Sequence, residues 1–430
     1  MRVLILGGYG LIGSAITKAL LHAGHDTVGL GRSARKGKAL IPAADWLEAD
    51  ISTLTQPKDW FPYLVNIDVV VNASGALQNG LANSLTALQR DSIIALIKAC
   101  EAQEVKRFIQ ISAPDADMNS PILFYNTKAA ADEALKASTL GWTIFRPALV
   151  ISPHAYGGTS LVRQLAGFPI VQPIMMGNAP VQTVCIDDVS GAVLFALENG
   201  MTKIDVDLAE DGAQTLLGLT LAIRKWLGFS VPKAVVKFPN WAGRVAAKFA
   251  DFAGWFGWRS ALRSTALDVL TRGVEADAKA WPALTGTPLK TLPQILDELP
   301  STMQERVFAR AMLVFPALLL TLSGFWIVSG LIGFAQTPEA IMVLNNVLPD
   351  PYAKAFVLLG SAADVAIGVA LLMRPWARRA AWASIMLASS YLVASVILTS
   401  HLWADPLGPM VKVFPAIALS LILAALLEER

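Results

Sequence analysis

The chain has 430 residues, of which 54% are hydrophobic and only 16% are charged, and its mean hydropathy is +0.51. This length allows two or three domains, and so apolar a composition argues against a wholly soluble enzyme and predicts that part of the chain lies in lipid. A net charge of +2 gives no sign of a nucleic-acid partner, and two cysteines with four scattered histidines predict neither a disulfide framework nor a metal site.

The first expected element is a buried strand at 3–6, where four branched apolar residues follow one another. Gly7, Gly10 and Gly13 come next, and an apolar-periodic segment after them predicts a helix. A glycine turn that opens a helix offers backbone N–H groups and the positive end of the helix dipole to a phosphate. The order of strand, glycines and helix therefore predicts a dinucleotide site, and a glycine-rich turn without a ligand is the alternative.

The second expected strand, at 25–31, ends in Arg32 and Ser33. An acidic residue at this strand end suits the ribose 2′-hydroxyl of NAD, whereas a basic residue suits the 2′-phosphate of NADP. We therefore expect NADP(H) as the preferred cofactor and NAD(H) as the alternative. Arg32 as an ordinary solvated surface residue would leave the preference open.

Three further strands are expected at 44–50, 67–75 and 106–112, with a helix at 85–100. Strands that alternate with helices at intervals of roughly 25 residues predict an α/β fold with a doubly wound parallel sheet. The first residues already form the first strand, so we expect no signal peptide and an N-terminal domain that stays in the cytoplasm.

Several motifs in this region resemble the extended and atypical branch of the short-chain dehydrogenase/reductase superfamily. They are G-G-Y-G-L-I-G at 7–13, A-D-I at 49–51, N-A-S-G at 72–75, I-S-A at 111–113, F-R-P-A at 145–148 and V-C-I-D-D-V at 184–189. The resemblance covers residues 1–300 or so and implies a Rossmann fold in which Asp50 and Ile51 flank the adenine and Ala73 and Gly75 line the ribose side. The cofactor-binding candidates are then Gly7, Tyr9, Gly10, Leu11, Ile12, Gly13, Arg32, Ser33, Asp50, Ile51, Ala73, Gly75 and Lys128.

The superfamily's catalytic signature is a Tyr-x-x-x-Lys pair on a helix, in which the tyrosine hydroxyl moves a proton while the nicotinamide carries hydride. Here the residue four positions before Lys128 is Phe124, which has no proton to give, and Tyr125 lies only three positions away. Positions three and four apart share a helix face, so Tyr125 is a shifted candidate, rotated by about 100° from the usual place. Ser112 lies at the strand end where the superfamily has its serine, although a shift of one residue would put Ala113 there.

Two readings of this site follow. Lys128, Tyr125 and Ser112 are the catalytic candidates if proton chemistry proceeds in the shifted geometry. Otherwise the site binds cofactor without conventional carbonyl reduction, and Lys128 holds the nicotinamide ribose in both cases.

The segment 236–305 is rich in tryptophan. From Trp241 to Trp258 the aromatic residues share an amphipathic helical pattern with Arg244 and Lys248. Tryptophan together with basic residues is typical of a helix in the headgroup layer of a membrane. An ordinary lid helix packed on the sheet is the alternative.

Four apolar stretches follow, at 311–335, 355–373, 380–400 and 413–427. Crossing the hydrocarbon layer takes roughly 20 residues, so we expect four transmembrane helices, the last of them extended through Met410 and Val411. Basic residues before the first stretch and a loop containing Arg374, Arg378 and Arg379 predict that the N-terminal domain and the C-terminus are cytoplasmic.

This C-terminal region, residues 306–430, resembles the DoxX-like membrane family, some of whose members are linked to quinone chemistry. The resemblance rests on the number of spans, the loop charges and the pattern Gly360-x-x-x-Asp364-x-x-x-Gly368. The glycines permit close helix approach, and an acid inside a membrane is costly, so Asp364 is either functional or hydrogen-bonded to a neighbouring helix. His401 is either a proton-exchanging neighbour of a quinone headgroup or an interfacial residue.

We therefore expect a Rossmann domain with a substrate lobe at 1–235, a tryptophan-rich membrane-proximal segment at 236–305 and a four-helix transmembrane domain at 306–430. The expected function is that of an NADP(H)-dependent oxidoreductase in a bacterial-type inner membrane, acting on a lipid-soluble acceptor such as a quinone or a lipid-like carbonyl. A non-catalytic NAD(P)H-binding sensor or assembly scaffold is the alternative.

Overall fold

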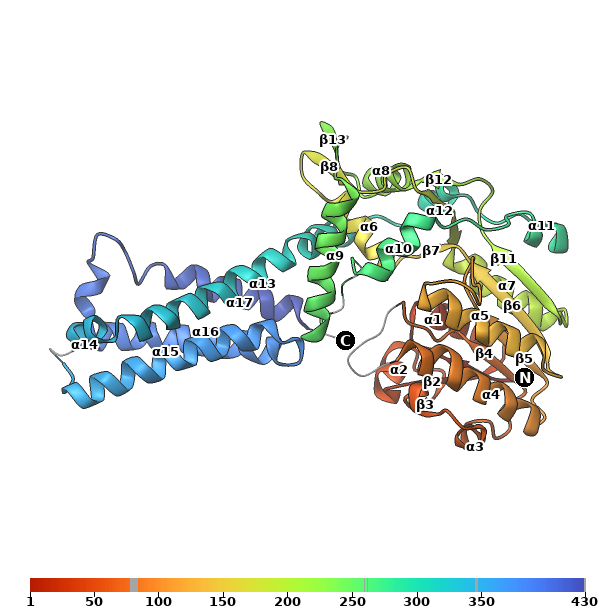
Figure 1. Cartoon of the computed structure of the whole chain (residues 1–430), viewed down its shortest axis with the longest axis horizontal. Coiled ribbons are helices and arrows are strands. Elements are labelled where there is room, and N and C mark those ends of the chain that lie inside the picture. Colours follow the sequence, from red (N-terminus) through yellow and green to blue (C-terminus); the bar gives the residue numbers. More distant parts are fainter. Residues whose placement is uncertain (78–83, 259, 261, 345–346, 429–430) are drawn as a thin grey trace. The chain divides into compact units, whose positions relative to one another are not determined.

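A seven-stranded parallel sheet forms the centre of the N-terminal part of the computed structural model, which describes residues 1–77, 84–258, 260, 262–344 and 347–428 (Figure 1). The strand order is β11-β6-β5-β4-β1-β2-β3, and it reverses direction between β1 and β4. The strands are β1 Arg2–Leu6, β2 Asp26–Gly31, β3 Asp45–Glu48, β4 Val69–Asn72, β5 Arg107–Ile111, β6 Gly141–Pro147 and β11 Ile204–Leu208. In such a sheet ligands bind beyond the carboxyl ends of the strands at the point of reversal, which here is where the glycine turn follows β1.

The sheet is covered on both faces because alternate residues of its strands point to opposite sides. Leu4 and Leu6 of β1 belong to a core that α4 (Ser92–Ala102) and α5 (Leu123–Lys136) help to form. Val3 and Ile5 belong to a second core, which α1 (Leu11–His22) and α7 (Ile186–Glu198) share. The predicted doubly wound Rossmann sheet is therefore confirmed.

The helix expected at 85–100 begins differently from the prediction. Residues Ala87–Asp91 form a π-helical turn before α4, so the chain winds more widely there than an α-helix does. Such turns are rare and are frequent at functional sites. Hydrophobic periodicity could not reveal it, because a single wider turn changes the spacing of only a few residues.

The remaining elements of this part surround the sheet. Its other helices are α2 Ala34–Leu40, α3 Pro57–Trp60, α6 Gly157–Ala166, α8 Leu216–Trp226, α9 Asn240–Trp255, α10 Ser264–Arg272, α11 Ala280–Thr285 and α12 Leu292–Glu298. Its short strands are β7 Leu149–Ile151, β8 Val171–Ile174, β9 Pro180–Val181, β10 Thr183–Cys185, β12 Gln214–Thr215 and β13 Ala234–Lys237, which pair two by two.

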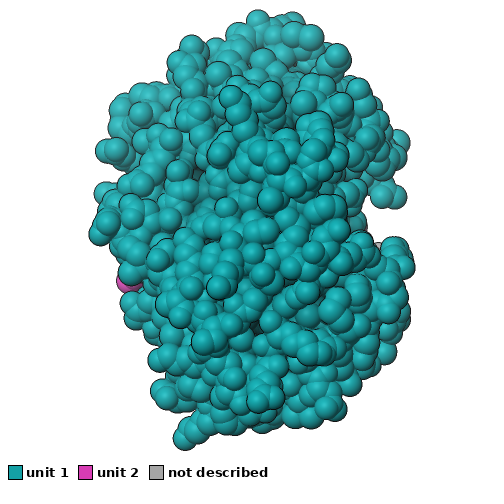
Figure 2. All heavy atoms as spheres, turned by 90° about the vertical axis from the view of Figure 1, so that its right-hand side faces the viewer, with its two compact units in different colours: residues 1–251, 260–309 teal, residues 252–259, 310–430 magenta. Residues whose placement is uncertain are grey.

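The chain divides into two units. Unit 1 comprises Met1–Asp251 and Ser260–Ala309, and unit 2 comprises Phe252–Arg259 and Arg310–Arg430 (teal and magenta in Figure 2). The dividing points fall inside helices, since α9 and the long helix α13 (Met303–Ala335) each contribute residues to both units.

Unit 2 is helical and apolar. Beside α13 it contains α14 (Thr337–Leu344), α15 (Asp350–Leu372), α16 (Arg374–Leu398) and α17 (Val413–Leu426) (Figure 1). Of the described helices, α13, α15 and α16 are long and apolar enough to cross a membrane. The expectation of four spans is met less well by α17, whose 14 residues extend only about 21 Å against a hydrocarbon core of about 30 Å.

Two details of this region differ from the predictions. Residues 409–412 form turns, so the expected extension of the last helix through Met410 and Val411 is wrong. The arginines expected in a loop lie instead in the first turns of α16, because Pro375 at its start favours helix initiation and only Met373 separates α15 from α16.

The contact between α1 and the glycine turn yields a first prediction. A Cβ atom on Gly13 would lie 2.1 Å from the carbonyl oxygen of Gly7, so Gly13→Ala must push α1 away from β1. We expect the free energy of unfolding of unit 1 to fall by about 1–3 kcal/mol and dinucleotide binding to weaken. A thiol-reactive fluorogenic dye measures this specifically, because both cysteines are buried in unit 1 and react only when it unfolds.

Gly191→Ala is the matched control, since a Cβ atom on this exposed glycine of α7 meets nothing within 4 Å. It should leave the melting temperature unchanged or raise it. An equal loss in both variants would contradict the role given to Gly13.

Candidate functional site

The glycine turn after β1 has the backbone conformation that a dinucleotide site requires. Gly7 adopts a φ of 69°, which glycine tolerates without strain, and its N–H donates to the carbonyl of Leu30 at 2.9 Å. The N–H of Gly10 returns to the carbonyl of Gly7 at 2.7 Å, which closes the turn. Gly13 lies directly over that carbonyl. The first and third glycines are thus fixed by close packing inside the turn.

The N-terminus of α1 has no capping side chain. Gly10 is the residue at the cap position, and it has no side chain to accept a hydrogen bond from the first turn. The N–H groups of Leu11, Ile12 and Gly13 precede the first intrahelical bond, which Ser14 makes to Gly10. These residues fit the pyrophosphate of a dinucleotide, since the N–H groups and helix dipole favour an anion there.

Tyr9 packs over the end of β2. A Cβ atom on Gly31 would lie 2.4 Å from Cε1 of Tyr9, so the ring rests on the glycine backbone. The same ring lies 5.9 Å from that of Trp46, centroid to centroid. Tyr9 is therefore held against the sheet by packing on both sides.

Charged groups of both signs lie where β2 and β3 end. Arg32 is exposed directly after β2, and the Ser33 hydroxyl caps α2 by accepting from the N–H of Lys36. The carboxylate of Glu48, at the end of β3, accepts from the N–H of Ala34 at 2.9 Å. The sequence motifs gave Arg32 and Ser33 but not Glu48, whose negative charge opposes a phosphate in this place.

Asp50 and Ile51 have local structural roles. The Asp50 carboxylate accepts from the N–H and the hydroxyl of Ser52, at 3.0 and 2.7 Å, and so begins the 3₁₀ turn Ile51–Thr53. Ile51 is buried in the core below the sheet.

Lys128 lies beneath the ends of β4 and β5. Its Nζ donates to the carbonyl of Ile111 at 2.7 Å and to that of Ser74 at 3.4 Å. A Cβ atom on Gly75 would lie 3.5 Å from this Nζ and 3.3 Å from Nε2 of Gln89. The structure thus brings Lys128 and Gly75 together, with Ala73 on the same strand end.

Gln89 is a neighbour of this group that the sequence did not indicate. It lies on the π-helical turn, donates to the carbonyl of Ala76 at 2.6 Å and accepts from the hydroxyl of Thr127 at 3.0 Å. The amide therefore ties the segment after β4 to α5. A single polar residue in a predicted helix carries no signal of such a position.

Ser112 is bound to an acid rather than presented to a substrate. Its hydroxyl donates to Asp132 at 2.5 Å, and Arg146 pairs with the same carboxylate oxygen at 2.9 Å. Arg146 also pairs with Asp205 at 2.7 Å, which makes a chain of charges between α5, β6 and β11. Asp132 follows Lys128 by one helical turn, and Arg146 lies in the F-R-P-A motif. Neither position by itself predicts that the two side chains form an ion pair.

Burial governs the ionisation of these groups. It lowers the pKa of Lys128 to about 8, although the charge of Asp132 acts in the opposite direction. It also raises the pKa of the Asp132 carboxyl, against the effects of Arg146 and Ser112. The ammonium of Lys128 is consequently costly to maintain at neutral pH and exists because two carbonyls and an acid surround it.

Tyr125 is not part of this arrangement. It is 3% exposed and packs with Ala113, Ile122 and Phe124. Burial, followed by the charge of Asp115, raises the pKa of its hydroxyl to about 12, whereas proton transfer would need a lowered value. Within the described residues this hydroxyl makes no hydrogen bond to Lys128, so α5 does not place the two groups as a Tyr–Lys pair.

Unit 2 contains a separate polar cluster around Asp364. Its two carboxylate oxygens accept from Tyr391 of α16 at 2.8 Å and from Ser329 of α13 at 3.0 Å. Gly368 lies against Ile327 of α13, whereas Gly360 lies against the hydroxyl of Tyr391. The two glycines thus serve different helix contacts, and Asp364 joins three helices.

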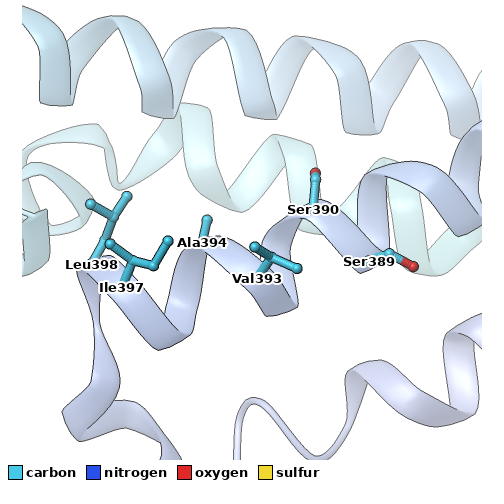
Figure 3. A pocket seen from close by; sticks show the side chains of 6 residues that line it. All are labelled: Ser389, Ser390, Val393, Ala394, Ile397 and Leu398. Carbon is cyan, nitrogen blue, oxygen red and sulfur yellow. The ribbon is translucent and has the colours of Figure 1, made fainter.

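Other features of unit 2 carry less chemistry. His401 is exposed on the 3₁₀ turn Ser400–Trp403. A shallow depression along α16 is lined by Ser389, Ser390, Val393, Ala394, Ile397 and Leu398 and contains no ionisable group (Figure 3). Among the described residues of the whole chain, no His, Cys, Asp or Glu side chains gather in threes to hold a metal ion.

The buried lysine predicts a specific pH dependence. The pKa of Lys128 is about 8 in the folded state against an ordinary lysine value of 10.5, so the unfolded state binds more protons between these limits. The free energy of unfolding should therefore rise between about pH 8 and pH 10.5, by a total of about 3 kcal/mol from this group. Calorimetric melting of the full chain and of Lys128→Met should differ by this rise, and parallel pH profiles of the two would contradict the buried position.

Comparison with known proteins agrees with the two-part structure. Residues 7–167 match an NAD(P)H-binding family and residues 323–421 match the DoxX-like family. Similar proteins include photosystem II assembly factor Ycf39 of Synechocystis, 31% identical over 34% of this chain and 44% of its own length. The assembly factor Ycf39 of Trieres chinensis is 29% identical over 47% of this chain and 61% of its own length. The matches thus span less than two thirds of either relative.

Solved structures share the fold. A dTDP-glucose 4,6-dehydratase from Bacillus anthracis, in complex with NAD, is 16% identical with a TM-score of 0.53 over 71% of this chain and 96% of its own. A UDP-glucuronic acid 4-epimerase from Bacillus cereus, also in complex with NAD, is 16% identical. Its TM-score is 0.51 over 73% of this chain and 100% of its own. The chain therefore joins a Rossmann domain that matches an NAD(P)H-binding family to a C-terminal region that matches the DoxX-like family.

Proposed function

We propose that this protein is a membrane-bound NAD(P)H-dependent oxidoreductase whose acceptor is a lipid-soluble quinone and not a carbonyl compound. The observation that carries the proposal is the position of Tyr125, whose side chain packs with Ala113, Ile122 and Phe124 and, within the described residues, makes no hydrogen bond to Lys128. A carbonyl needs a proton donor beside the hydride, and Ser112 is already engaged with Asp132.

A quinone avoids this requirement. A nicotinamide cofactor held here would supply a hydride, and a quinone that accepts it can take the accompanying proton from water, so no tyrosine would be needed. Within the protein, the N-terminus of α1 would hold the pyrophosphate, and Lys128 would hold the nicotinamide ribose. Long apolar helices in the same chain favour an acceptor that dissolves in lipid.

The preference for NADP(H) and the orientation in the membrane belong to the same proposal. Arg32 and Ser33 suit a 2′-phosphate, and Glu48 weakens that preference without removing it. Arg374, Arg378 and Arg379 at the start of α16 favour a cytoplasmic location for that end of the helix. The Rossmann domain would then lie at the cytoplasmic side of an inner membrane.

A non-catalytic role as an assembly factor or redox sensor is the second candidate. The sequence similarity to photosystem II assembly factors supports it, as does the enclosure of Lys128 by carbonyls and Gln89. In this role the dinucleotide would stabilise unit 1 without being consumed.

Turnover separates the two candidates. We expect the purified full chain in detergent to oxidise NADPH when a short-chain quinone is added, and Lys128→Ala to lower the rate by about 10²-fold, because the reacting groups are then misplaced. Absorbance at the reduced nicotinamide band measures the rate.

Tyr125→Phe is the matched control on the same helix and should leave the rate unchanged. Tight NADPH binding without quinone-dependent oxidation would support the assembly or sensor role. A rate that depends on Tyr125 would show that the site has been placed wrongly.

Substitutions of Arg32 and Glu48 test the preference between NADPH and NADH. Arg32→Asp should weaken NADPH binding relative to NADH by about tenfold or more, because a charged hydrogen bond to phosphate is replaced by repulsion. Glu48→Gln should shift the preference the other way. Isothermal titration with both cofactors measures the ratio, and an unchanged ratio in Arg32→Asp would remove the phosphate role from this residue.

A further inference from the structure

Helix α9 has an inverted distribution of side chains. Its buried residues are small, Gly243 and Ala247, and a Cβ atom on Gly243 would lie 2.6 Å from the sulfur of Met175. Its large residues point outward, with Trp241 69%, Phe249 71% and Trp255 74% exposed. A helix on the surface of a soluble protein has the opposite arrangement, with its apolar stripe against the core.

The outward residues form one continuous face. They are separated by three or four positions along the helix and therefore lie on the same side. They are Trp241, Val245, Phe249, Phe252 and Trp255. Arg244 and Lys248, both exposed, lie within and beside this face. Aromatic and basic side chains on one face are typical of a helix that lies in a membrane interface.

The residues that directly follow α9 belong to unit 2 and are hydrogen-bonded within it. The carbonyl of Phe256 accepts from the N–H of Arg374, the first residue of α16, at 2.9 Å. The indole of Trp258 donates to the carbonyl of Leu372, the last residue of α15, at 2.6 Å. Phe256 and Trp258 are thus fixed at the junction of two helices that are apolar enough to cross a membrane.

That junction has the composition of a membrane boundary. A hollow there is lined by Arg374, Pro375, Arg378, Arg379, Trp382 and Leu427. The guanidinium of Arg379 lies 5.6 Å from the ring of Trp376, and that of Arg374 lies 5.6 Å from the ring of Trp258. Tryptophans mark the headgroup level, and clustered arginines attract anionic lipids.

We propose that α9 lies in the headgroup layer of the bilayer that holds this protein's own apolar helices, with its aromatic face toward the acyl chains and its basic residues among anionic phospholipid headgroups. The occupant of the exposed face is therefore lipid. The course of the chain supports this assignment, because Phe256, which is hydrogen-bonded at the α15–α16 junction, directly follows the 16-residue helix that contains Trp241 and Phe249. The proposal does not depend on whether the Rossmann domain is catalytically active.

Site-directed spin labelling tests the depth of this face in the full chain. The two native cysteines are 0% and 3% exposed, so an introduced cysteine is the reactive one under native conditions. Phe249→Cys carries the label on the aromatic face. Lys98→Cys, at an exposed position of α4, is the aqueous control, and Leu359→Cys, 71% exposed on α15, is the control within the hydrocarbon.

In phosphatidylglycerol-containing vesicles, collisions of the label at position 249 with a water-soluble nickel chelate should fall by about tenfold relative to Lys98→Cys. Collisions with oxygen should lie between those of the two controls. Nickel accessibility equal to that of Lys98→Cys would overturn the proposal. Protection in detergent that grows with protein concentration, with dipolar broadening between labels, would also overturn it, because a second copy would then cover the face.

A separate variant tests whether the basic residues of α9 interact with anionic headgroups. Adding Arg244→Glu and Lys248→Glu to Phe249→Cys should raise nickel accessibility in phosphatidylglycerol vesicles and change it little in purely zwitterionic ones. An equal change in both would overturn the part of the proposal that concerns headgroup charge.

Discussion

A charged ammonium enclosed by the ends of two strands is the constraint on which the nucleotide-binding part of this protein depends. Lys128 is held by the carbonyls of Ile111 and Ser74, and one turn later Asp132 meets Arg146 and Ser112. Charges this far from water persist only when they are surrounded by compensating groups. The position of α5 on the sheet is therefore fixed by electrostatics as much as by apolar packing.

The sheet itself could be predicted from the sequence, because its information is local. A run such as Val3–Leu6 followed by glycines has few alternatives, and the resemblance to short-chain dehydrogenase/reductases implied a Rossmann fold. The surroundings of Lys128 could not be predicted in this way. The rotation of α5 about its axis decides which of its side chains face the sheet. Positions three and four residues before Lys128 share one helix face, so the sequence could not decide whether Tyr125 lies beside Lys128. In the structure Tyr125 packs with Ala113, Ile122 and Phe124. The pairing of Asp132 with Arg146 joins residues distant in sequence, and no spacing rule reports it.

The two units follow opposite packing rules. In unit 1 the large apolar side chains lie inside, as Trp60 and Phe108 do. In unit 2 small residues such as Gly330 and Gly368 lie between helices, while large ones such as Leu359 point outward. The second rule is that of a protein whose solvent is hydrocarbon, where close backbone approach and van der Waals contact replace the hydrophobic effect. α9 follows the second rule although most of its residues belong to unit 1.

The π-helical turn at Ala87–Asp91 makes the position of the Gln89 side chain depend on the number of residues in this turn. Such a turn accommodates one residue more than an α-helix does over the same rise, and each residue of an α-helix rotates its successor by about 100°. A chain shorter by one residue here would wind as a regular helix and carry the amide of Gln89 around to another side. The contact between Gln89 and the segment after β4 thus depends on the number of residues in this turn as well as on their types.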